Sequence, residues 1–245
     1  MRALLGLPLA AGITRDADAA AQSNAAAGGG LRLAPKSKLV MIGDSITDTG
    51  RARPVGEGRG DAIGNGYVMM VNALIGATQP QLGIRIVNMG ISGNTVRDLA
   101  ERWQTDVFDL QPDYVSVMIG ANDVWRQFDA PLRTELHVPI DEFERTYDQL
   151  IATTRPRVKE MILITPFYLE PNREDAMRAK MDAYGDVVRR LAKKHGTPMI
   201  DSQAAFDEIL EAVYPAAINA DRVHPDQVGA MVLARAFVNA IGFQW

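Results

Sequence analysis

Three residues of this chain have the types and the spacing that acyl transfer by serine requires. A short apolar run ends at Gly43, and Ser45 lies two residues further along the chain. Near the other end of the chain, Asp221 precedes His224 by three residues. A serine hydroxyl is a poor nucleophile until a base takes its proton, and an imidazole oriented by a carboxylate is such a base. The short separation lets Asp221 fold back to Nδ1 of His224, and Pro225 disfavours a helix there, so we expect this pair on a loop.

Attack on an ester also requires hydrogen-bond donors for the oxyanion that develops in the transition state. Gly93 offers a backbone N–H where a side chain would obstruct approach, Asn122 offers a side-chain NH₂, and the N–H of Ser45 is a third donor. Each residue also has an ordinary structural explanation: Ser45 as a turn residue, Asn122 as an Asx turn, and Asp221 with His224 as a helix-capping region. Their joint occurrence is what indicates a site.

The pattern of apolar residues between these positions predicts a parallel sheet with helices. Nearly continuous apolar runs, typical of strands buried on both faces, occupy 38–43, 84–89, 113–119, 158–164 and 197–201. Between them, helical spacing is shown by Val96, Leu99, Ala100 and Trp103, by Phe143, Tyr147, Leu150 and Ile151, and by Met177, Met181, Tyr184, Val188 and Leu191. A last helix at about 226–241 is expected to carry Met231, Ala234, Phe237 and Val238 on one face. This alternation indicates an α/β fold with right-handed crossovers and a doubly wound sheet.

Small, polar, glycine-bearing segments follow the first three predicted strands, at 43–48, 90–95 and 120–123. Ligands of open α/β sheets bind beyond the carboxyl ends of the strands. The segment after the fourth strand, 165–168, is more apolar and suits a pocket wall. The sequence therefore predicts that the chemically useful residues meet at one edge of the sheet.

Composition argues against several other function classes. A chain of 245 residues can bury one sizeable core, and its net charge of −4 argues against a nucleic-acid partner. Cysteine is absent, which excludes disulfides and thiolate nucleophiles. The histidines do not form a His-Glu-x-x-His pair, and we expect neither a metal nor an organic cofactor. No stretch is long enough to span a membrane, so no membrane partner is expected.

The first thirty residues differ in composition from the rest of the chain. They begin Met-Arg, pass through a short apolar segment and become rich in alanine and glycine. A weak or truncated export signal and a disordered leader both explain this pattern. We expect a leader at 1–35 and one hydrolase domain at 36–245, located in the cytoplasm, or exported if the leader is a signal sequence.

Four separated blocks resemble the signature blocks of the SGNH (GDSL-type) hydrolases, in the order of that family: Gly43-Asp44-Ser45, Gly90-Ile91-Ser92-Gly93-Asn94-Thr95, Gly120-Ala121-Asn122-Asp123 and Asp221-Arg222-Val223-His224. Further segments, at 48–54, 91–99, 122–127 and 214–217, are similar to the bacterial acetylxylan esterases of this family, and the similarity covers roughly 36–245. The resemblance implies a three-layer α/β/α sandwich around a five-stranded parallel sheet, the flavodoxin-like SGNH hydrolase fold.

The resemblance also implies roles for the site residues. Ser45 would be the nucleophile, His224 the base and Asp221 its partner, while Ser45, Gly93 and Asn122 would form the oxyanion hole. The substrate would be an acetylated xylo-oligosaccharide, xylan or another small acetyl ester, no cofactor is implied, and such relatives can form homo-oligomers.

Further residues are expected to contact the substrate: Asp44, Tyr67, Asn94 and Trp125. The Trp125 ring could stack on a sugar, with packing in the core or at an interface as the alternative explanation. Two alternative functions stay open: a short-chain lipid esterase or thioesterase with the same fold, and a carbohydrate-binding relative without catalytic activity.

Overall fold

The computed structural model describes residues 32–58 and 60–243. The two interpretations of residues 1–30 therefore lie outside the described residues, and the predicted boundary at residue 36 stays a prediction. Within the described part of the chain, no helix is long and apolar enough to cross a membrane.

A five-stranded parallel sheet lies at the centre of the described residues. Its strands are β1 Lys38–Gly43, β2 Arg85–Asn88, β3 Tyr114–Met118, β4 Glu160–Ile164 and β5 Met199–Ile200. They lie in the order β2-β1-β3-β4-β5, and every pairing is parallel. Each strand falls within its predicted range, and its residues after the first are buried, as expected for strands covered on both faces.

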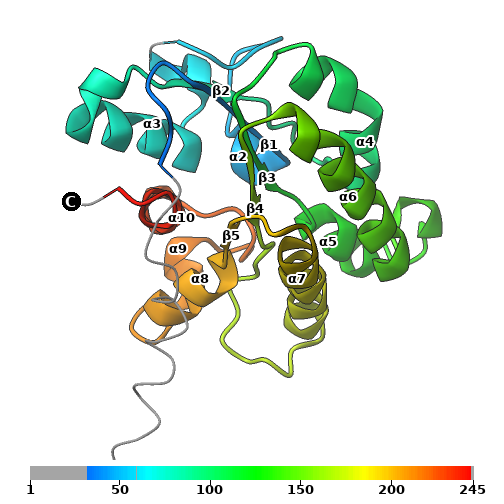
Figure 1. The fold of residues 1–245 in the computed structure, drawn as a ribbon. Helices are drawn as coiled ribbons and strands as arrows, with labels where there is room; N and C mark the ends of the chain where they lie inside the picture. Colours follow the sequence, from blue (N-terminus) through cyan, green and yellow to red (C-terminus); the bar gives the residue numbers. More distant parts are fainter. Residues whose placement is uncertain (1–31, 59, 244–245) are drawn as a thin grey trace, which may run out of the picture. The chain divides into compact units, whose positions relative to one another are not determined.

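Helices cover both faces of this sheet (Figure 1). One face is covered by α3 Tyr67–Thr78, α8 Ser202–Leu210 and α10 Gln227–Ala240. The other is covered by α4 Val96–Trp103, α5 Ala121–Asp129, α6 Ile140–Thr154 and α7 Ala176–His195. The short elements are α2 Ser45–Asp48, α9 Pro215–Ile218, η1 Gly60–Ile63, η2 Pro80–Leu82, η3 Gln104–Phe108, η4 Thr134–Leu136 and η5 Arg155–Arg157. The predicted α/β class and three-layer sandwich are confirmed.

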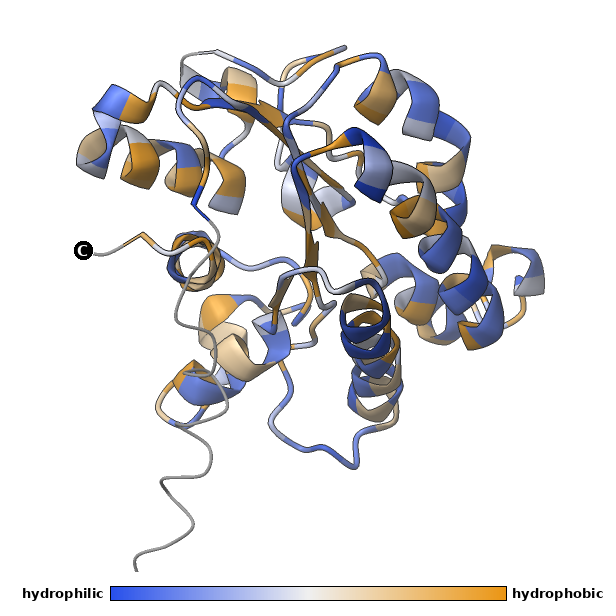
Figure 2. Cartoon of the chain, viewed as in Figure 1, coloured by the Kyte–Doolittle hydropathy of each residue, from blue (hydrophilic) through white to orange (hydrophobic). Residues whose placement is uncertain are grey.

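Apolar residues concentrate on the strands and on the helix faces toward them (Figure 2). The predicted face of the last helix is wrong at one position. Met231 is 36% exposed, whereas Ala234, Phe237 and Val238 are buried as predicted, and the buried face also includes Ala230 and Leu233. Ala100, which was expected on the buried face of α4, is also exposed.

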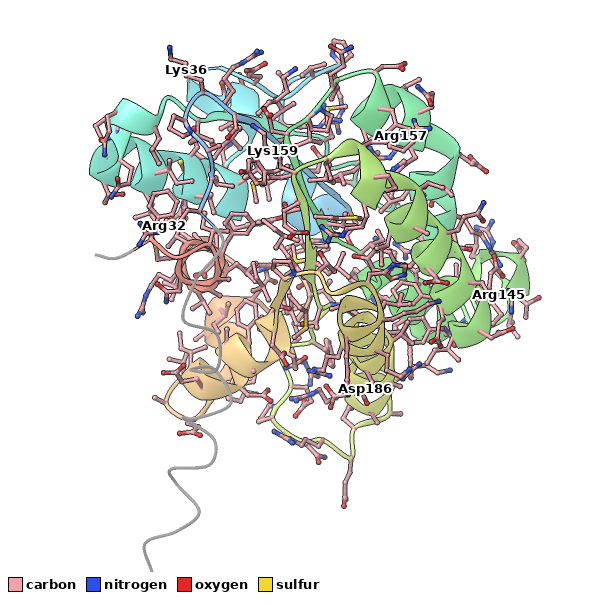
Figure 3. The ribbon with its side chains drawn as sticks, in the orientation of Figure 1. Arg32, Lys36, Arg145, Arg157, Lys159 and Asp186 are labelled. Carbon is pink, nitrogen blue, oxygen red and sulfur yellow. The ribbon has the colours of Figure 1, made fainter. Side chains whose placement is uncertain are left out.

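Charged side chains occupy the outer sides of the helices. Arg145 and Asp186, labelled in Figure 3, extend outward from α6 and α7. The solvent-facing side of these two helices is therefore polar, while their opposite side contributes Tyr147 and Val188 to the core.

The chain order of the strands creates the place for a site. After β1 the chain moves outward to β2, then crosses back to the other side of β1 to form β3. The connections that leave the carboxyl ends of β1 and β3 therefore diverge, and such a switch point is where open α/β sheets bind their ligands. Ser45 follows β1 and Asn122 follows β3, so the topology brings both segments to this edge of the sheet.

Candidate active site

The structure brings Ser45, His224 and Asp221 into one hydrogen-bonded chain. Ser45 Oγ lies 2.7 Å from His224 Nε2, and His224 Nδ1 lies 2.6 Å from Asp221 Oδ2. The imidazole thus has one nitrogen on the hydroxyl and the other on the carboxylate, which is the geometry that lets a histidine take the proton of a serine.

The start of α2 presents the Ser45 hydroxyl. Asp44 is the N-cap of this helix, and its side chain accepts a hydrogen bond from the Ile46 N–H at 3.0 Å. As the first residue of the helix, Ser45 has a backbone N–H without an acceptor inside the helix. A Cβ on Gly43 would lie 2.3 Å from the carbonyl oxygen of Met118 on β3, so the strand can turn into the helix here only with glycine.

The loop before α10 holds the histidine and the aspartate. Asp221 Oδ1 accepts the backbone N–H groups of Val223 and His224, each at 2.9 Å. Burial alone would raise the pKa of Asp221, but the hydrogen bonds from the His224 ring and from these two N–H groups hold it below its ordinary value. Asp221 therefore stays ionised at neutral pH, as the partner of an imidazolium must.

Arg222, one of the two residues between Asp221 and His224, also holds this loop in place. Arg222 has a φ of 60°, its carbonyl oxygen accepts the Leu169 N–H at 2.9 Å, and its guanidinium forms an ion pair with Glu170. These contacts hold the loop against the segment that follows β4.

Two of the predicted oxyanion donors, Gly93 and Asn122, lie on neighbouring segments. Asn122 is in the first turn of α5, and its Nδ2 donates to the backbone oxygen of Asn94 at 3.0 Å, which joins the start of α5 to the loop after β2. Gly93 lies on this loop with a φ of 84°. A Cβ on Gly93 would meet no protein atom within 4 Å, so the packing of the protein does not require glycine here, and the expected obstruction of a ligand by a side chain stays a prediction. The positive φ, which side chains rarely adopt, is the physical reason for glycine there.

Sequence reasoning missed the two buried side chains that hold the loop of Gly93. Asp48 Oδ2 accepts both the N–H and the hydroxyl of Ser92 at 2.9 Å. Asn88 Oδ1 accepts the Gly90 N–H at 2.9 Å, while its Nδ2 donates to the Thr47 carbonyl at 2.6 Å. A polar residue at the end of a buried strand was the available signal for Asn88.

Arg102 on α4 joins the loops around Ser45 and Gly93, and sequence reasoning missed it too. Its guanidinium donates to the Gly43 carbonyl at 3.0 Å, to the Met89 carbonyl at 2.8 Å and to Asn94 Oδ1 at 2.7 Å. The predicted substrate contact Asn94 therefore has its side-chain oxygen engaged by Arg102 within the protein.

The family model for GDSL-like lipases and acylhydrolases matches residues 41–232, which is most of the chain. This chain belongs to that family. It is 55% identical over 215 residues to the acetylxylan esterase of Geobacillus stearothermophilus, covering 88% of this chain and 98% of that protein.

Solved structures place this GDSL hydrolase close to the same relative. The crystal structure of Axe2, an acetylxylan esterase from Geobacillus stearothermophilus, matches with a TM-score of 0.87 and 55% identity, over 88% of this chain and 98% of the other. LAE5, an alpha/beta hydrolase enzyme from the metagenome of Lake Arreo, matches with a TM-score of 0.85 and 56% identity, over 87% of this chain and 98% of the other. Structures described as catalytic mutants of Axe2 carry replacements of a serine, an aspartate and a histidine.

Two residues predicted to contact substrate are buried in this GDSL hydrolase. Tyr67 is 2% exposed, its hydroxyl lies 3.2 Å from Thr47 Oγ1, and burial raises its pKa above the ordinary value. Asp44 is 1% exposed and caps α2. Both side chains make hydrogen bonds within the protein, Tyr67 with Thr47 and Asp44 with the Ile46 N–H, and their predicted contacts with substrate stay predictions.

Burial shifts the titration of two carboxyl groups beside the site. It raises the pKa of Asp44 to about 6, although the Ile46 N–H and the charge of His224 act in the opposite direction. It raises the pKa of Asp123 to about 7, against the hydrogen bond from the Val96 N–H. Among the described residues, one oxygen of each carboxyl group has no hydrogen-bond partner, so the charged forms are poorly solvated.

Trp125 lies beside His224. Its ring centroid is 5.7 Å from that of His224 at an interplanar angle of 59°, and the side chain is partly exposed. Asn122 and Trp125 both lie on α5, so one helix carries the predicted oxyanion donor and the predicted aromatic contact. Within the described ranges, no group of three or more His, Cys, Asp or Glu side chains is placed to hold a metal ion.

Proposed function

We propose that this chain is a serine carboxylester hydrolase that removes acetyl groups from acetylated xylan and xylo-oligosaccharides through an acetyl-enzyme on Ser45. The observation that carries the mechanism is the continuous hydrogen-bonded chain from Ser45 through His224 to Asp221. The sugar substrate is supported by the 55% identity, over nearly the whole relative, to an acetylxylan esterase.

The first half-reaction forms the acetyl-enzyme. His224 Nε2 takes the proton of Ser45 Oγ across the 2.7 Å hydrogen bond as Oγ attacks the acetyl carbonyl carbon. The carbonyl oxygen becomes an oxyanion, which accepts hydrogen bonds from the N–H groups of Ser45 and Gly93 and from Asn122 Nδ2. His224 then gives its proton to the sugar oxygen as the ester C–O bond breaks.

The second half-reaction releases acetate. His224 takes a proton from water, whose oxygen attacks the acetyl carbonyl carbon, and the same donors hold the second oxyanion. Collapse of this intermediate breaks the bond to Ser45 Oγ, which regains its proton from His224. Asp221 stays ionised throughout and stabilises the imidazolium.

One experiment tests the nucleophile and the substrate together. Wild-type protein and Ser45→Ala are assayed on xylose tetraacetate, on p-nitrophenyl acetate and on a p-nitrophenyl ester of a long fatty acid. We expect rapid turnover of both acetyl esters by the wild type, little turnover of the long ester, and loss of all activity in Ser45→Ala.

Other outcomes would favour the alternatives. Preference for the long acyl chain, or for an acyl thioester, would indicate a lipid esterase or thioesterase instead. Full activity in Ser45→Ala would refute the mechanism, and a wild type that binds acetylated xylose without turnover would indicate a binding protein. Treatment with a serine-reactive phosphonate, followed by mass analysis of peptides, is expected to place the adduct on Ser45. The expected homo-oligomer stays a prediction that sedimentation can test.

A further inference from the structure

The amide of Asn122 is held by different partners at its two ends. Its Nδ2 donates to the backbone oxygen of Asn94 at 3.0 Å, and its Oδ1 accepts a hydrogen bond from the Arg126 guanidinium at 3.2 Å. An amide oxygen can only accept and an amide nitrogen only donate. A carbonyl at one end and a guanidinium at the other therefore select one of the two flip orientations of Asn122.

This orientation matters for the donor that Asn122 supplies. The NH₂ group has two hydrogens, and the bond to Asn94 uses one of them. Among the described residues the NH₂ group makes no second hydrogen bond, and the proposed oxyanion would accept its other hydrogen. In the flipped orientation the acceptor Oδ1 would take the place of Nδ2, where it would repel both the Asn94 carbonyl and an oxyanion.

Arg126 is itself positioned by its neighbours on α5. It lies one turn after Asn122, forms an ion pair with Asp129, and its guanidinium carbon is 5.3 Å from the centroid of the Trp125 ring. Its side chain is 29% exposed, so it lies at the rim rather than in the core. The same Trp125 ring faces His224. One arginine thus contacts both the oxyanion donor and the aromatic wall beside the base.

We propose that Arg126 is a positioning residue that acts on the reaction through Asn122. The guanidinium locks the amide in the donating orientation, and its positive charge at Oδ1 polarises the amide so that the N–H group becomes a stronger donor. Because the oxyanion forms only during reaction, the effect falls on the transition state rather than on substrate binding. The inference rests on the proposed role of Asn122 in the oxyanion hole.

A double-mutant cycle tests whether Arg126 acts through Asn122. The four proteins are wild type, Arg126→Met, Asn122→Ala and the double variant, all assayed on p-nitrophenyl acetate so that sugar recognition does not enter. Methionine keeps an unbranched side chain but removes the charge and the donors. Arg145→Met is the matched control, because Arg145 is also a helix-surface arginine paired with an aspartate of its own helix.

We expect Arg126→Met to lower kcat by about 10-fold with little change in KM, against about 10²–10³ for loss of the donor itself in Asn122→Ala. The double variant is expected to be no slower than Asn122→Ala, because the arginine has nothing left to act on. Arg145→Met is expected to keep the wild-type kcat. A further 10-fold loss in the double variant, or an unchanged kcat in Arg126→Met, would overturn the inference.

Two further measurements separate this role from general damage to the fold. Affinity for a boronic acid, which forms a tetrahedral adduct with an active-site serine, is expected to fall in Arg126→Met in parallel with kcat. Arg126→Lys keeps the positive charge and is expected to recover part of the lost rate. A lysine variant no faster than Arg126→Met would overturn the role of the cation.

Failure of the role of Arg126 can be distinguished from failure of the proposed function. A wild type that cleaves p-nitrophenyl acetate but not acetylated xylose would refute the sugar substrate and leave the cycle interpretable. An active Ser45→Ala would refute the nucleophile. An additive cycle in a protein that passes both tests would refute only the role of Arg126.

Discussion

Replacement of Asp123 by asparagine should change how the stability of this protein depends on pH. Asp123 is fully buried, and burial raises its pKa to about 7 from an ordinary value of 3.8, with smaller contributions in the same direction from the charges of Asp44 and Asp98. Asparagine cannot titrate but keeps the oxygen that accepts the Val96 N–H at 3.0 Å. The exchange therefore removes the titration and retains the hydrogen bond.

The sign follows from proton binding in the two states. Between about pH 4 and pH 7, Asp123 is ionised in the unfolded chain and protonated in the folded protein, so the folded state binds more protons. The contribution of Asp123 to stability is therefore greatest in acid and is lost as the pH rises to about 7. Each pH unit in this window changes it by about 1.4 kcal/mol, which gives about 3 kcal/mol between pH 7 and pH 5.

Urea unfolding of wild type and Asp123→Asn at pH 5, 6, 7 and 8 measures this difference. We expect the free energy of unfolding of the wild type, relative to the variant, to rise by about 3 kcal/mol from pH 8 to pH 5, which corresponds to roughly 6–12 °C in Tm. Asp44 also titrates in this window, but it is present in both proteins, so most of its contribution cancels.

A surface carboxylate provides the control. The pKa of Asp141 is held below its ordinary value by the hydrogen bond from Arg145, so Asp141 is ionised in both states throughout the range tested. Asp141→Asn should therefore differ from the wild type by an amount that does not change between pH 5 and pH 8. A pH-independent difference for Asp123→Asn as well, or one of the opposite sign, would refute the reasoning.

Three further variants test other parts of the structure. Asp221→Asn should lower kcat by about 10⁴-fold without unfolding the protein, because it removes the carboxylate at His224 Nδ1; a loss below tenfold would contradict that role. Trp125→Ala should raise KM for xylose tetraacetate but not for p-nitrophenyl acetate, whereas equal effects on both esters would mean that the ring only packs against His224. Asp175→Ala should lower Tm by about 2–4 °C at unchanged kcat, since Asp175 caps the first turn of α7 with two hydrogen bonds; an unchanged Tm would show that this cap contributes nothing.

Local patterns were sufficient for most of the fold. Strands buried on both faces are apolar at nearly every position, so their existence and order along the chain are readable from the sequence. The buried face of a helix is harder to predict. In α10 neighbouring positions are apolar, so more than one choice of buried face fits the helical spacing of about 3.6 residues. Only packing against α3 and α8 showed that Leu233, and not Met231, faces inward.

The side chains that hold the loops were not predictable in the same way. Asp48 binds Ser92 across 44 residues, and Arg102 binds the Gly43 carbonyl across 59. An aspartate or arginine on a short helix has no periodicity that separates such a role from a solvated surface position. Burial of polar side chains was not predictable either: Asp44, next to Ser45, and Tyr67, at the start of α3, were expected to contact the substrate, and both are buried.

The sequence by itself determined the types of the reacting groups and one of their contacts. Asp221 and His224 are three residues apart, so a single turn brings carboxylate and imidazole together whatever the rest of the fold does. The contact between Ser45 and His224 spans 179 residues, and no local interaction sets it. Only the tertiary structure decided that contact, because it depends on where the parallel sheet places the end of β1 relative to the loop before α10. The same applies to Asn122, whose donor is aimed by a carbonyl on one loop and a guanidinium on its own helix.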